Sequence, residues 1–235
     1  MSDEIEWWEY DTAAEMAEAV AGDVGFVVES ALGARGQALL ALPGGKSPIA
    51  AMERLAKAKI DWKRVTIIPG DDRLVPVNDP LSNVAALARI FLPKGARVLP
   101  IGSENVDYQM AGKAADARLQ DLHWPPDLVW LGIGTDGHTA SILPGPDMAA
   151  ALDAPKARRA VGVMPDPLPP EAPVARVTLT KAAILSARVL MVTLSGTEKR
   201  RVLEEAIRAG ASGKTAIGRV LADAEQAIDI HWSAS

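Results

Sequence analysis

The sequence predicts an α/β fold with a mostly parallel sheet and helices on both faces. Two observations support this prediction. Short apolar runs of strand length alternate with longer segments of helical periodicity along the chain. The runs are continuously apolar, as in strands buried on both faces, and most end in polar loops that contain glycine. The 235 residues are 49% hydrophobic and 23% charged, so we expect residues 1–235 to form a single domain.

The composition excludes several classes of function. A formal net charge of -5 argues against a nucleic-acid-binding surface, which needs clustered cations. The chain has no cysteine, which excludes disulfides, a cysteine nucleophile and a thiolate zinc site. The acidic first residues and the lack of a long apolar run predict a cytoplasmic protein that does not bind membranes. We expect no metal, no cofactor, and a monomer or a weak homodimer.

The first predicted elements are a helix from 13 to about 33, with apolar residues at spacings of three and four, and a buried strand at 37–42. The strand runs into a loop at 43–48. Ser47 is predicted to cap the next helix, and Pro48 to occupy its first position.

This loop is a predicted phosphate site. A strand, a glycine turn and a helix N-terminus together present unpaired N–H groups to an anion, and a lysine adds charge. The alternative of a plain turn needs only one glycine, and a nucleotide P-loop needs glycine where the chain has Leu40. The predicted phosphate ligands are Gly44, Gly45, Lys46 and Ser47.

A second polar loop follows the predicted strand at 65–69. It contains two adjacent carboxylates, Asp71 and Asp72, and then Arg73. Adjacent carboxylates repel each other, and the arginine can neutralise one of them or hold a ligand anion. A solvated turn is the alternative.

In the middle of the chain, Ser82 or Asn83 is expected to cap a helix, and 97–101 to be extended. A further helix is predicted at 107–122, and His123 at its end is expected to be a cap or a surface residue. The expected buried positions of this helix are Met110, Ala114, Ala117 and Leu119.

The stretch from Asp127 to Gly145 gives the strongest functional signal. It joins a buried strand to a glycine-rich loop, and ligands of open α/β sheets bind at the carboxyl ends of strands. A dinucleotide fingerprint is disfavoured because Pro144 and Pro146 prevent the long helix it needs. His138 could be structural, but an imidazole between a carboxylate and hydroxyls favours proton transfer. The polar residues of the loop are Asp136, His138, Thr139 and Ser141.

The last part of the chain continues the alternation. The proline-rich segment 155–173 reads as a short strand and a surface loop, and could mark a small subdomain that flanks the cleft. Thr180 is expected to cap a short helix, and His231 to be structural. Lys199 lies in a first helical turn, against the helix-dipole preference, which suggests an anion partner rather than an ordinary surface lysine. The predicted strands are 160–163, 176–180, 188–194 and 227–232.

These motifs, in their order along the chain, resemble those of the 6-phosphogluconolactonases. They cover most of the chain from 43 to 199, and the resemblance implies a modified Rossmann-like α/β fold without a nucleotide, related to that of glucosamine-6-phosphate isomerases. The most specific motif is Asp136-Gly137-His138-Thr139-Ala140-Ser141, and the glycine loop is the least specific. The others are Asp71-Asp72-Arg73 with Val75-Pro76 and Asp79, Ser82-Asn83, Arg176-Val177-Thr178 and Gly196-Thr197-Glu198-Lys199.

Two positions depart from the family pattern. Asp72 stands where the family usually has glutamate, and Lys46 where it usually has a small hydroxyl residue. Neither change removes a catalytic group, but both affect which finer phosphate contacts are expected.

The resemblance implies hydrolysis of 6-phospho-D-glucono-1,5-lactone to 6-phosphogluconate in the pentose phosphate pathway. A histidine would take the proton of water, an aspartate would fix its tautomer, and an arginine would stabilise negative charge on the phosphate or the intermediate. No G-x-S-x-G elbow or H-x-x-x-H zinc pair occurs, so no metal or covalent nucleophile is required. The expected catalytic residues are His138, Asp71, Arg73 and Asp136. The expected phosphate ligands are Gly44, Gly45, Lys46, Ser47, Arg176 and Lys199.

Two other functions are alternatives. Amino-sugar phosphate isomerases and deaminases typically carry an aromatic residue at the position of Arg73 and lack the continuation at 139–141. A non-catalytic sugar-phosphate sensor would keep the anion loops, could lose the base, and would be expected to carry a DNA-binding module. The chain keeps His138 and shows no such module.

Overall fold

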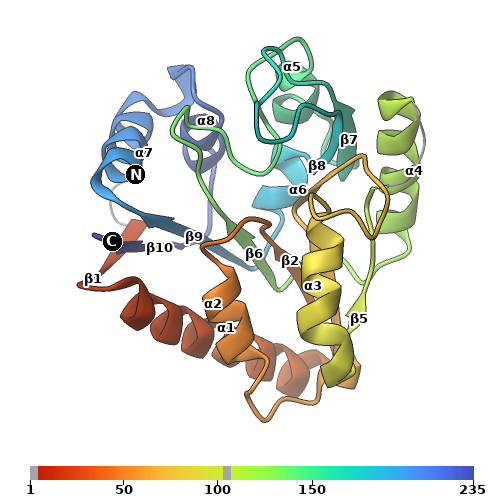
Figure 1. Cartoon of the computed structure of the whole chain (residues 1–235), viewed down its shortest axis with the longest axis vertical. Helices are drawn as coiled ribbons and strands as arrows, with labels where there is room; N and C mark the ends of the chain where they lie inside the picture. The colour runs from red at the N-terminus through yellow and green to blue at the C-terminus, as the bar shows by residue number, and fades with distance from the viewer. Residues whose placement is uncertain (1–4, 103–106) are drawn as a thin grey trace.

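The computed structural model describes residues 5–102 and 107–235, which form a central sheet between two groups of helices (Figure 1). The strands of this sheet are β1 (Ile5–Tyr10), β2 (Ala38–Leu42), β3 (Val65–Pro69), β5 (Arg97–Val98), β6 (Leu128–Leu131), β9 (Val189–Ser195) and β10 (Ile228–Ser233). Their order is β1-β10-β9-β6-β2-β3-β5, and every neighbouring pair is parallel. The predicted α/β fold is therefore confirmed.

Helices cover both faces of the sheet, as predicted. One face packs against α1 (Ala13–Arg35), α2 (Ile49–Leu55) and α3 (Asn83–Phe91). On the side of the other face lie α4 (Tyr108–Gln120), α5 (Met148–Leu152), α6 (Lys181–Leu185), α7 (Thr197–Ala209) and α8 (Ala216–Leu221), which share one hydrophobic core with it. Short 3-10 turns are η1 (Trp62–Arg64), η2 (Leu92–Lys94) and η3 (Gly210–Ser212). None of the helices in the described ranges is both long and apolar enough to span a lipid bilayer.

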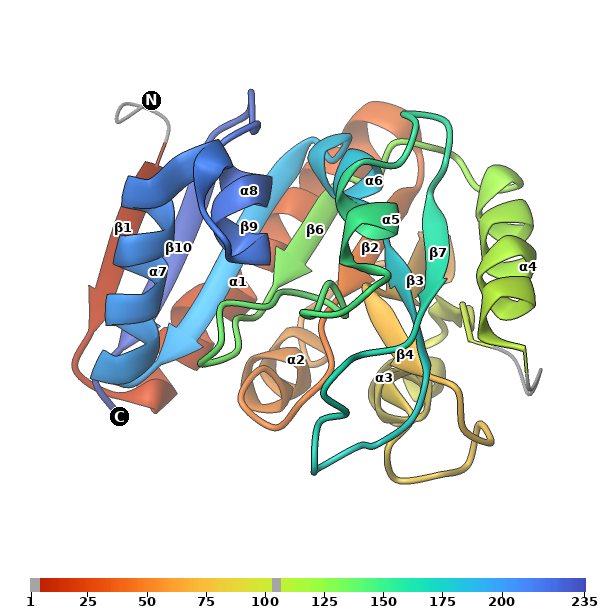
Figure 2. The same ribbon diagram turned by 90° about the horizontal axis from the view of Figure 1, so that it is seen from above.

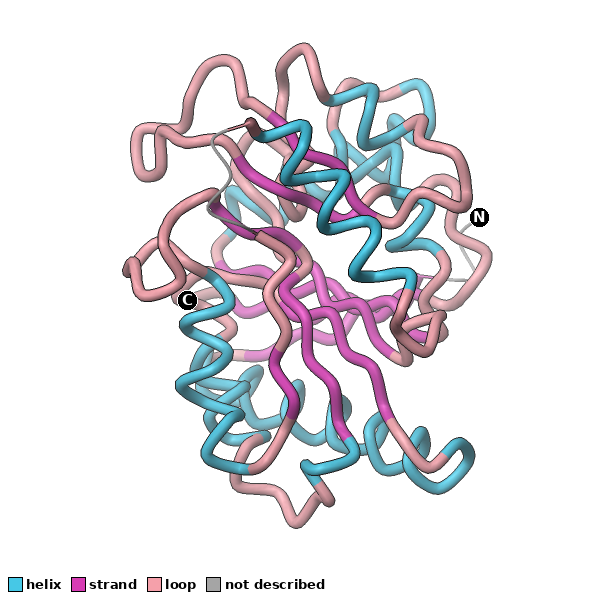
Figure 3. Tube along the Cα trace, turned by 90° about the vertical axis from the view of Figure 1, so that its right-hand side faces the viewer, coloured by secondary structure: helices cyan, strands magenta, loops and turns pink. Residues whose placement is uncertain are grey.

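A second, antiparallel sheet lies beside the first. Its strands are β4 (Asp71–Arg73), β8 (Arg176–Leu179) and β7 (Ala160–Val163), in the order β4-β8-β7. Figure 3 shows it apart from the main sheet. The prediction of a loop at 71–73 was wrong, because these residues pair with β8, a segment far along the chain.

Two glycines set the position of α4 next to β7 (Figure 2). A Cβ on Gly112 would lie 2.0 Å from the backbone N of Gly162, so the two backbones approach too closely for any larger residue. The helix therefore buries Ala111, Gly112, Ala115 and Leu119. The predicted face was wrong apart from Leu119, since Met110, Ala114 and Ala117 are exposed.

The helix ends follow the expected cap chemistry in most places. Gly36, with φ of 77°, ends α1, and the hydroxyls of Ser82 and Thr180 accept backbone N–H bonds of 3.2 Å and 3.1 Å at the starts of α3 and α6. The predicted cap by Ser47 was wrong. α2 begins at Ile49 and its N-cap, Pro48, provides no side-chain hydrogen bond.

β1 was not predicted, and it forms the edge of the main sheet beside β10. His231 of β10 is fully buried, and its Nδ1 lies 3.0 Å from the hydroxyl of Tyr10 in β1. The structural role predicted for His231 is thus that of joining these two strands.

Candidate active site

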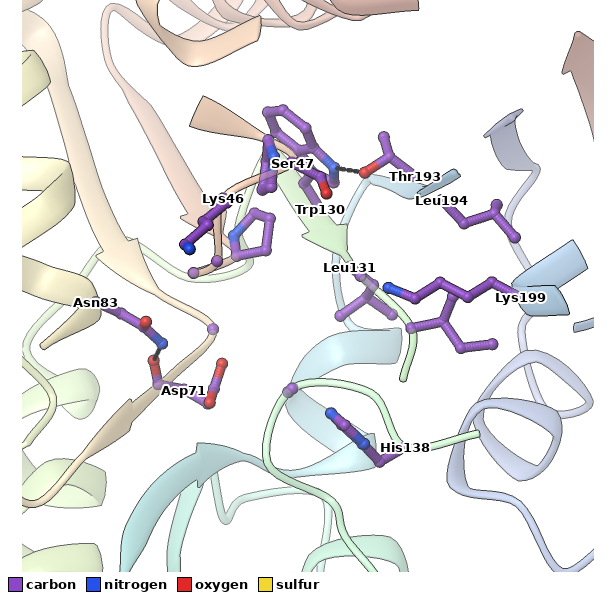
Figure 4. Close-up of a pocket in the computed structure, with 18 of the residues that line it drawn as sticks. Lys46, Ser47, Asp71, Asn83, Trp130, Leu131, His138, Thr193, Leu194 and Lys199 are labelled. Atoms are coloured by element: carbon purple, nitrogen blue, oxygen red, sulfur yellow. Dashed lines mark hydrogen bonds between the residues drawn. The ribbon is translucent and has the colours of Figure 1, made fainter. Parts of the chain in front are cut away.

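A pocket opens at the carboxyl ends of β2, β3, β6 and β9, where the strand-to-helix loops converge. All the predicted site residues except Asp136 line it, so residues from 44 to 199 meet in one place. Figure 4 shows Lys46, Asp71, His138 and Lys199 arranged around a common space. Its floor includes Trp130, whose indole N–H donates to the hydroxyl of Thr193 at 2.9 Å.

His138 and Asp136 form a hydrogen-bonded pair in the loop after β6. His138 Nδ1 lies 2.5 Å from Oδ1 of Asp136, and the same oxygen accepts the backbone N–H of His138 at 3.1 Å. The hydrogen bond from the imidazole holds the pKa of Asp136 below its usual value, so the carboxylate is ionised. An ionised acceptor at Nδ1 places the imidazole proton there and leaves Nε2 free to accept another.

Glycine makes this pair sterically feasible. A Cβ on Gly134 would lie 2.2 Å from Nδ1 of His138 and 2.6 Å from Oδ1 of Asp136. The loop closes through bonds of 3.0 Å from Gly134 N to the His138 carbonyl and from Gly137 N to the Gly134 carbonyl. Gly137 has φ of 77° and fits against Thr215, which would lie 2.5 Å from any Cβ at that position.

Asp71 pairs with Ser141 and not with His138. Its Oδ2 accepts the hydroxyl of Ser141 at 2.5 Å, and the backbone N–H of Ser141 donates to Thr178 Oγ1 at 3.1 Å. The sequence left open which aspartate contacts His138, and the structure gives that contact to Asp136. Asp71 also lines the pocket.

Asp72 is part of the framework and not of the pocket. Its carboxylate accepts the backbone N–H groups of Asn83 at 2.7 Å and Val84 at 3.1 Å, at the start of α3. Burial raises the pKa of Asp72 to about 6, which outweighs the opposing effect of these N–H groups. The shorter side chain at this position therefore affects the anchoring of α3 and not a direct phosphate contact.

Two arginines lie opposite each other at the edge of the pocket. Arg73 of β4 and Arg176 of β8 are register partners, and Arg176 is only 2% exposed. Burial and the neighbouring Arg73 lower the pKa of Arg176. Within the described ranges the Nε atoms of both arginines are buried without a hydrogen-bond partner. Like charges opposed in a buried strand pair cost stability, so this arrangement suits an anionic ligand.

The glycine loop and Lys199 complete the cationic side of the pocket. Gly44 to Ser47 follow β2, and Gly45 adopts φ of 91°. Lys199 extends from the first turn of α7 toward the same space (Figure 4). Asn83 also lines the pocket, although the sequence patterns identified it only as a candidate helix cap and as part of a family motif; its burial there became visible only in the fold.

A second cavity lies at the other end of the strands, and Asp127, which lines it, already has partners. Asp127 accepts the backbone N–H of Leu39 at 2.8 Å and pairs with Arg35 at 2.6 Å and Arg188 at 3.6 Å. This cluster joins the end of α1 to the sheet. We therefore locate the chemistry in the first pocket.

The sheet and its pocket are typical of an α/β enzyme that acts on small molecules. The chain belongs to the glucosamine-6-phosphate isomerase/6-phosphogluconolactonase family, whose model matches residues 11–232. It is 33% identical to the 6-phosphogluconolactonase of Pseudomonas aeruginosa over 228 residues, which are 95% of this chain and 92% of that protein. It is 34% identical to that of Rhizobium meliloti, over 95% and 97% of the two chains.

Solved structures agree with this assignment. The crystal structure of a 6-phosphogluconolactonase from Shewanella baltica superposes with a TM-score of 0.89 at 28% identity, and covers all of both chains. A monomeric glucosamine-6-phosphate deaminase has a TM-score of 0.79 at 16% identity, over 97% of each chain. The second likeness shows a shared fold alone.

Proposed function

We propose that the chain hydrolyses 6-phospho-D-glucono-1,5-lactone to 6-phospho-D-gluconate in the pentose phosphate pathway, with His138 as the general base. One observation carries the proposal: the paired imidazole of His138 and the cationic loop at 44–47 line the same pocket. The lactonase relatives support the substrate, since they match over almost the whole chain.

The reaction follows from the free Nε2 of His138. This nitrogen takes a proton from water as the water oxygen bonds to the lactone carbonyl carbon, and Asp136 stabilises the imidazolium that forms. The bond between that carbon and the ring oxygen then breaks, and Nε2 returns the proton to the leaving oxygen. The ring opens, and the product is a carboxylic acid that ionises at neutral pH.

The cationic side chains of the pocket have two roles in this mechanism. The loop at 44–47, with Lys199 and Arg176, holds the phosphate, so that binding energy far from the carbonyl positions the reacting carbon. Arg73 stabilises negative charge on the phosphate or on the tetrahedral intermediate.

Freshly prepared lactone provides the test. Acid release measured at constant pH, with and without the purified chain, should show a rate that increases in proportion to protein concentration above spontaneous hydrolysis. No acceleration would overturn the proposal. Ammonia release from glucosamine 6-phosphate would instead favour the deaminase, and binding of 6-phosphogluconate without turnover would favour the sensor.

Further expectations belong to the same proposal. We infer one domain, a monomer or a weak homodimer, a cytoplasmic location and no nucleic-acid partner. Light scattering across a concentration series measures the mass, and a dimer that persists at nanomolar concentration would contradict the weak association.

A further inference from the structure

Asn83 connects three parts of the pocket through one buried amide. It is 3% exposed and is the first residue of α3. Its Oδ1 accepts a hydrogen bond from Nη1 of Arg73 at 2.8 Å. Its Nδ2 donates a hydrogen bond to the backbone carbonyl of Asp71 at 2.7 Å, which Figure 4 shows. The amide also fills the space beside Gly44, where a Cβ would lie 1.9 Å from Oδ1.

The acceptors that the structure gives Arg73 are both neutral. They are Oδ1 of Asn83 and the carbonyl of Leu81, the latter at 3.1 Å. A carboxylate in place of the amide would hold the guanidinium equally well but would cancel its charge. The neutral amide fixes the orientation of Arg73 and leaves its full positive charge directed at the pocket.

We propose that Asn83 is a positioning residue, which orients Arg73 and the Gly44 turn while keeping the charge of Arg73 available to the substrate. The inference rests on the proposed function, because the substrate's phosphate or the intermediate is the anion that this charge meets. It goes beyond that function in assigning a role to a side chain that need not touch the reacting atoms.

Two substitutions at this position separate this role from a structural one. Asn83→Asp keeps the bond to Arg73, loses the donation to the Asp71 carbonyl and adds a negative charge, whereas Asn83→Leu removes both side-chain bonds and adds no charge. A structural role predicts that the leucine variant is the more impaired in every respect. Our proposal predicts the opposite order for anion binding: the aspartate variant unfolds at the higher temperature yet binds the anion more weakly.

The probe is 6-phosphogluconate, with its dissociation constant measured by calorimetry, alongside KM and kcat for the lactone. We expect Asn83→Asp to weaken 6-phosphogluconate binding, or to lower kcat/KM, by about tenfold or more. The loss of one hydrogen bond to a charged group changes an equilibrium constant by about this factor. A change mainly in KM would indicate that Arg73 interacts with the phosphate. A change mainly in kcat would indicate that Arg73 interacts with the tetrahedral intermediate. Asn78→Asp makes the same chemical change at an exposed position outside the pocket and should leave both constants unchanged.

A double-mutant cycle tests whether the effect passes through Arg73. In an Arg73→Gln background, Asn83→Asp should lose most of its effect, because no charge remains to be cancelled. A folded Asn83→Asp variant with unchanged binding and unchanged kcat/KM overturns the inference. An equal loss of binding or of kcat/KM in the wild-type and Arg73→Gln backgrounds overturns it as well. Lack of lactone hydrolysis by the unmodified chain would overturn the proposed function instead, and calorimetry would still test Asn83.

Discussion

Nδ1 of His138 lies 2.5 Å from Oδ1 of Asp136, two residues earlier in the same loop. Such a short sequence separation places both members of the pair in one loop, which packs against Thr215 through Gly137. The pair can therefore be altered at either residue or at the glycine that makes room for it.

Replacing Asp136 with asparagine should lower kcat by about 10²-fold or more, because an amide can donate to Nδ1 and so move the imidazole proton to Nε2. Binding of 6-phosphogluconate should change little. Steady-state kinetics and calorimetry measure the two quantities, with Asp11→Asn at an exposed position as the control. A normal kcat would remove Asp136 from the mechanism.

For His138→Ala we expect a loss of turnover of roughly 10² to 10⁴ with the affinity for 6-phosphogluconate retained. His123→Ala removes an exposed imidazole outside this pocket and should leave turnover unchanged. Near-normal hydrolysis by the His138 variant would show that another group activates the water.

Gly134→Ala should act like a change of His138, although it removes no functional group. The added methyl would lie 2.2 Å from Nδ1, so the imidazole must leave its position and kcat should fall by about 10²-fold. Gly33→Ala meets nothing within 4 Å and lies within α1, where alanine should stabilise by about 0.5–1 kcal/mol. If both variants kept full activity, the steric argument would be wrong.

Lys199→Ala should raise KM about tenfold or more with a small effect on kcat, because a charged hydrogen bond to the phosphate is lost. Lys113→Ala, on the exposed side of α4, is the matched control. Initial rates across a range of lactone concentrations separate the two constants. An unchanged KM contradicts a phosphate contact.

Asp72 should make the free energy of unfolding fall as the pH rises, which is the opposite of the usual effect of an aspartate. Its pKa is about 6 in the folded chain and 3.8 as the reference for the unfolded one, so between these values the folded state holds the extra proton. This contribution is fully present below about pH 4 and is lost as the pH rises through 6. The difference of about two pH units corresponds to roughly 3 kcal/mol.

Urea unfolding of the wild type and of Asp72→Asn at pH 4.5 and pH 7 measures this contribution. Relative to the variant, the wild type should be more stable at pH 4.5 than at pH 7. The same difference at both pH values would mean that folding does not shift the pKa of Asp72.

The sequence was most informative where strand and loop are contiguous. β2 with the glycine loop, and β6 with the loop to Ser141, could be located because each apolar run passes directly into its polar residues. The predictions that were wrong concern elements whose partners lie far along the chain. β4 exists because β8 pairs with it, and the buried face of α4 is set by the approach of Gly112 to Gly162.

The candidate site shows the same division. Sequence patterns predicted that a histidine, two arginines and two lysines would meet, and one pocket contains them. They did not determine that Ser141 would bind Asp71, or that Asn83 would bind Arg73, since these contacts cross between separate strand ends. Local sequence fixes the chemical groups at each strand end, whereas the pairing between strand ends is a property of the whole sheet.

The pairing of β1 with β10 has a consequence for biosynthesis. Residues 5–10 are made before their hydrogen-bonding neighbour, residues 228–233, which lies more than two hundred residues further along the chain. Until then, β1 has no edge to join, because β10 separates it from the rest of the sheet. Residues 5–10 must therefore wait for residues 228–233 before they can join the sheet, so this pairing is a long-range and late step of folding.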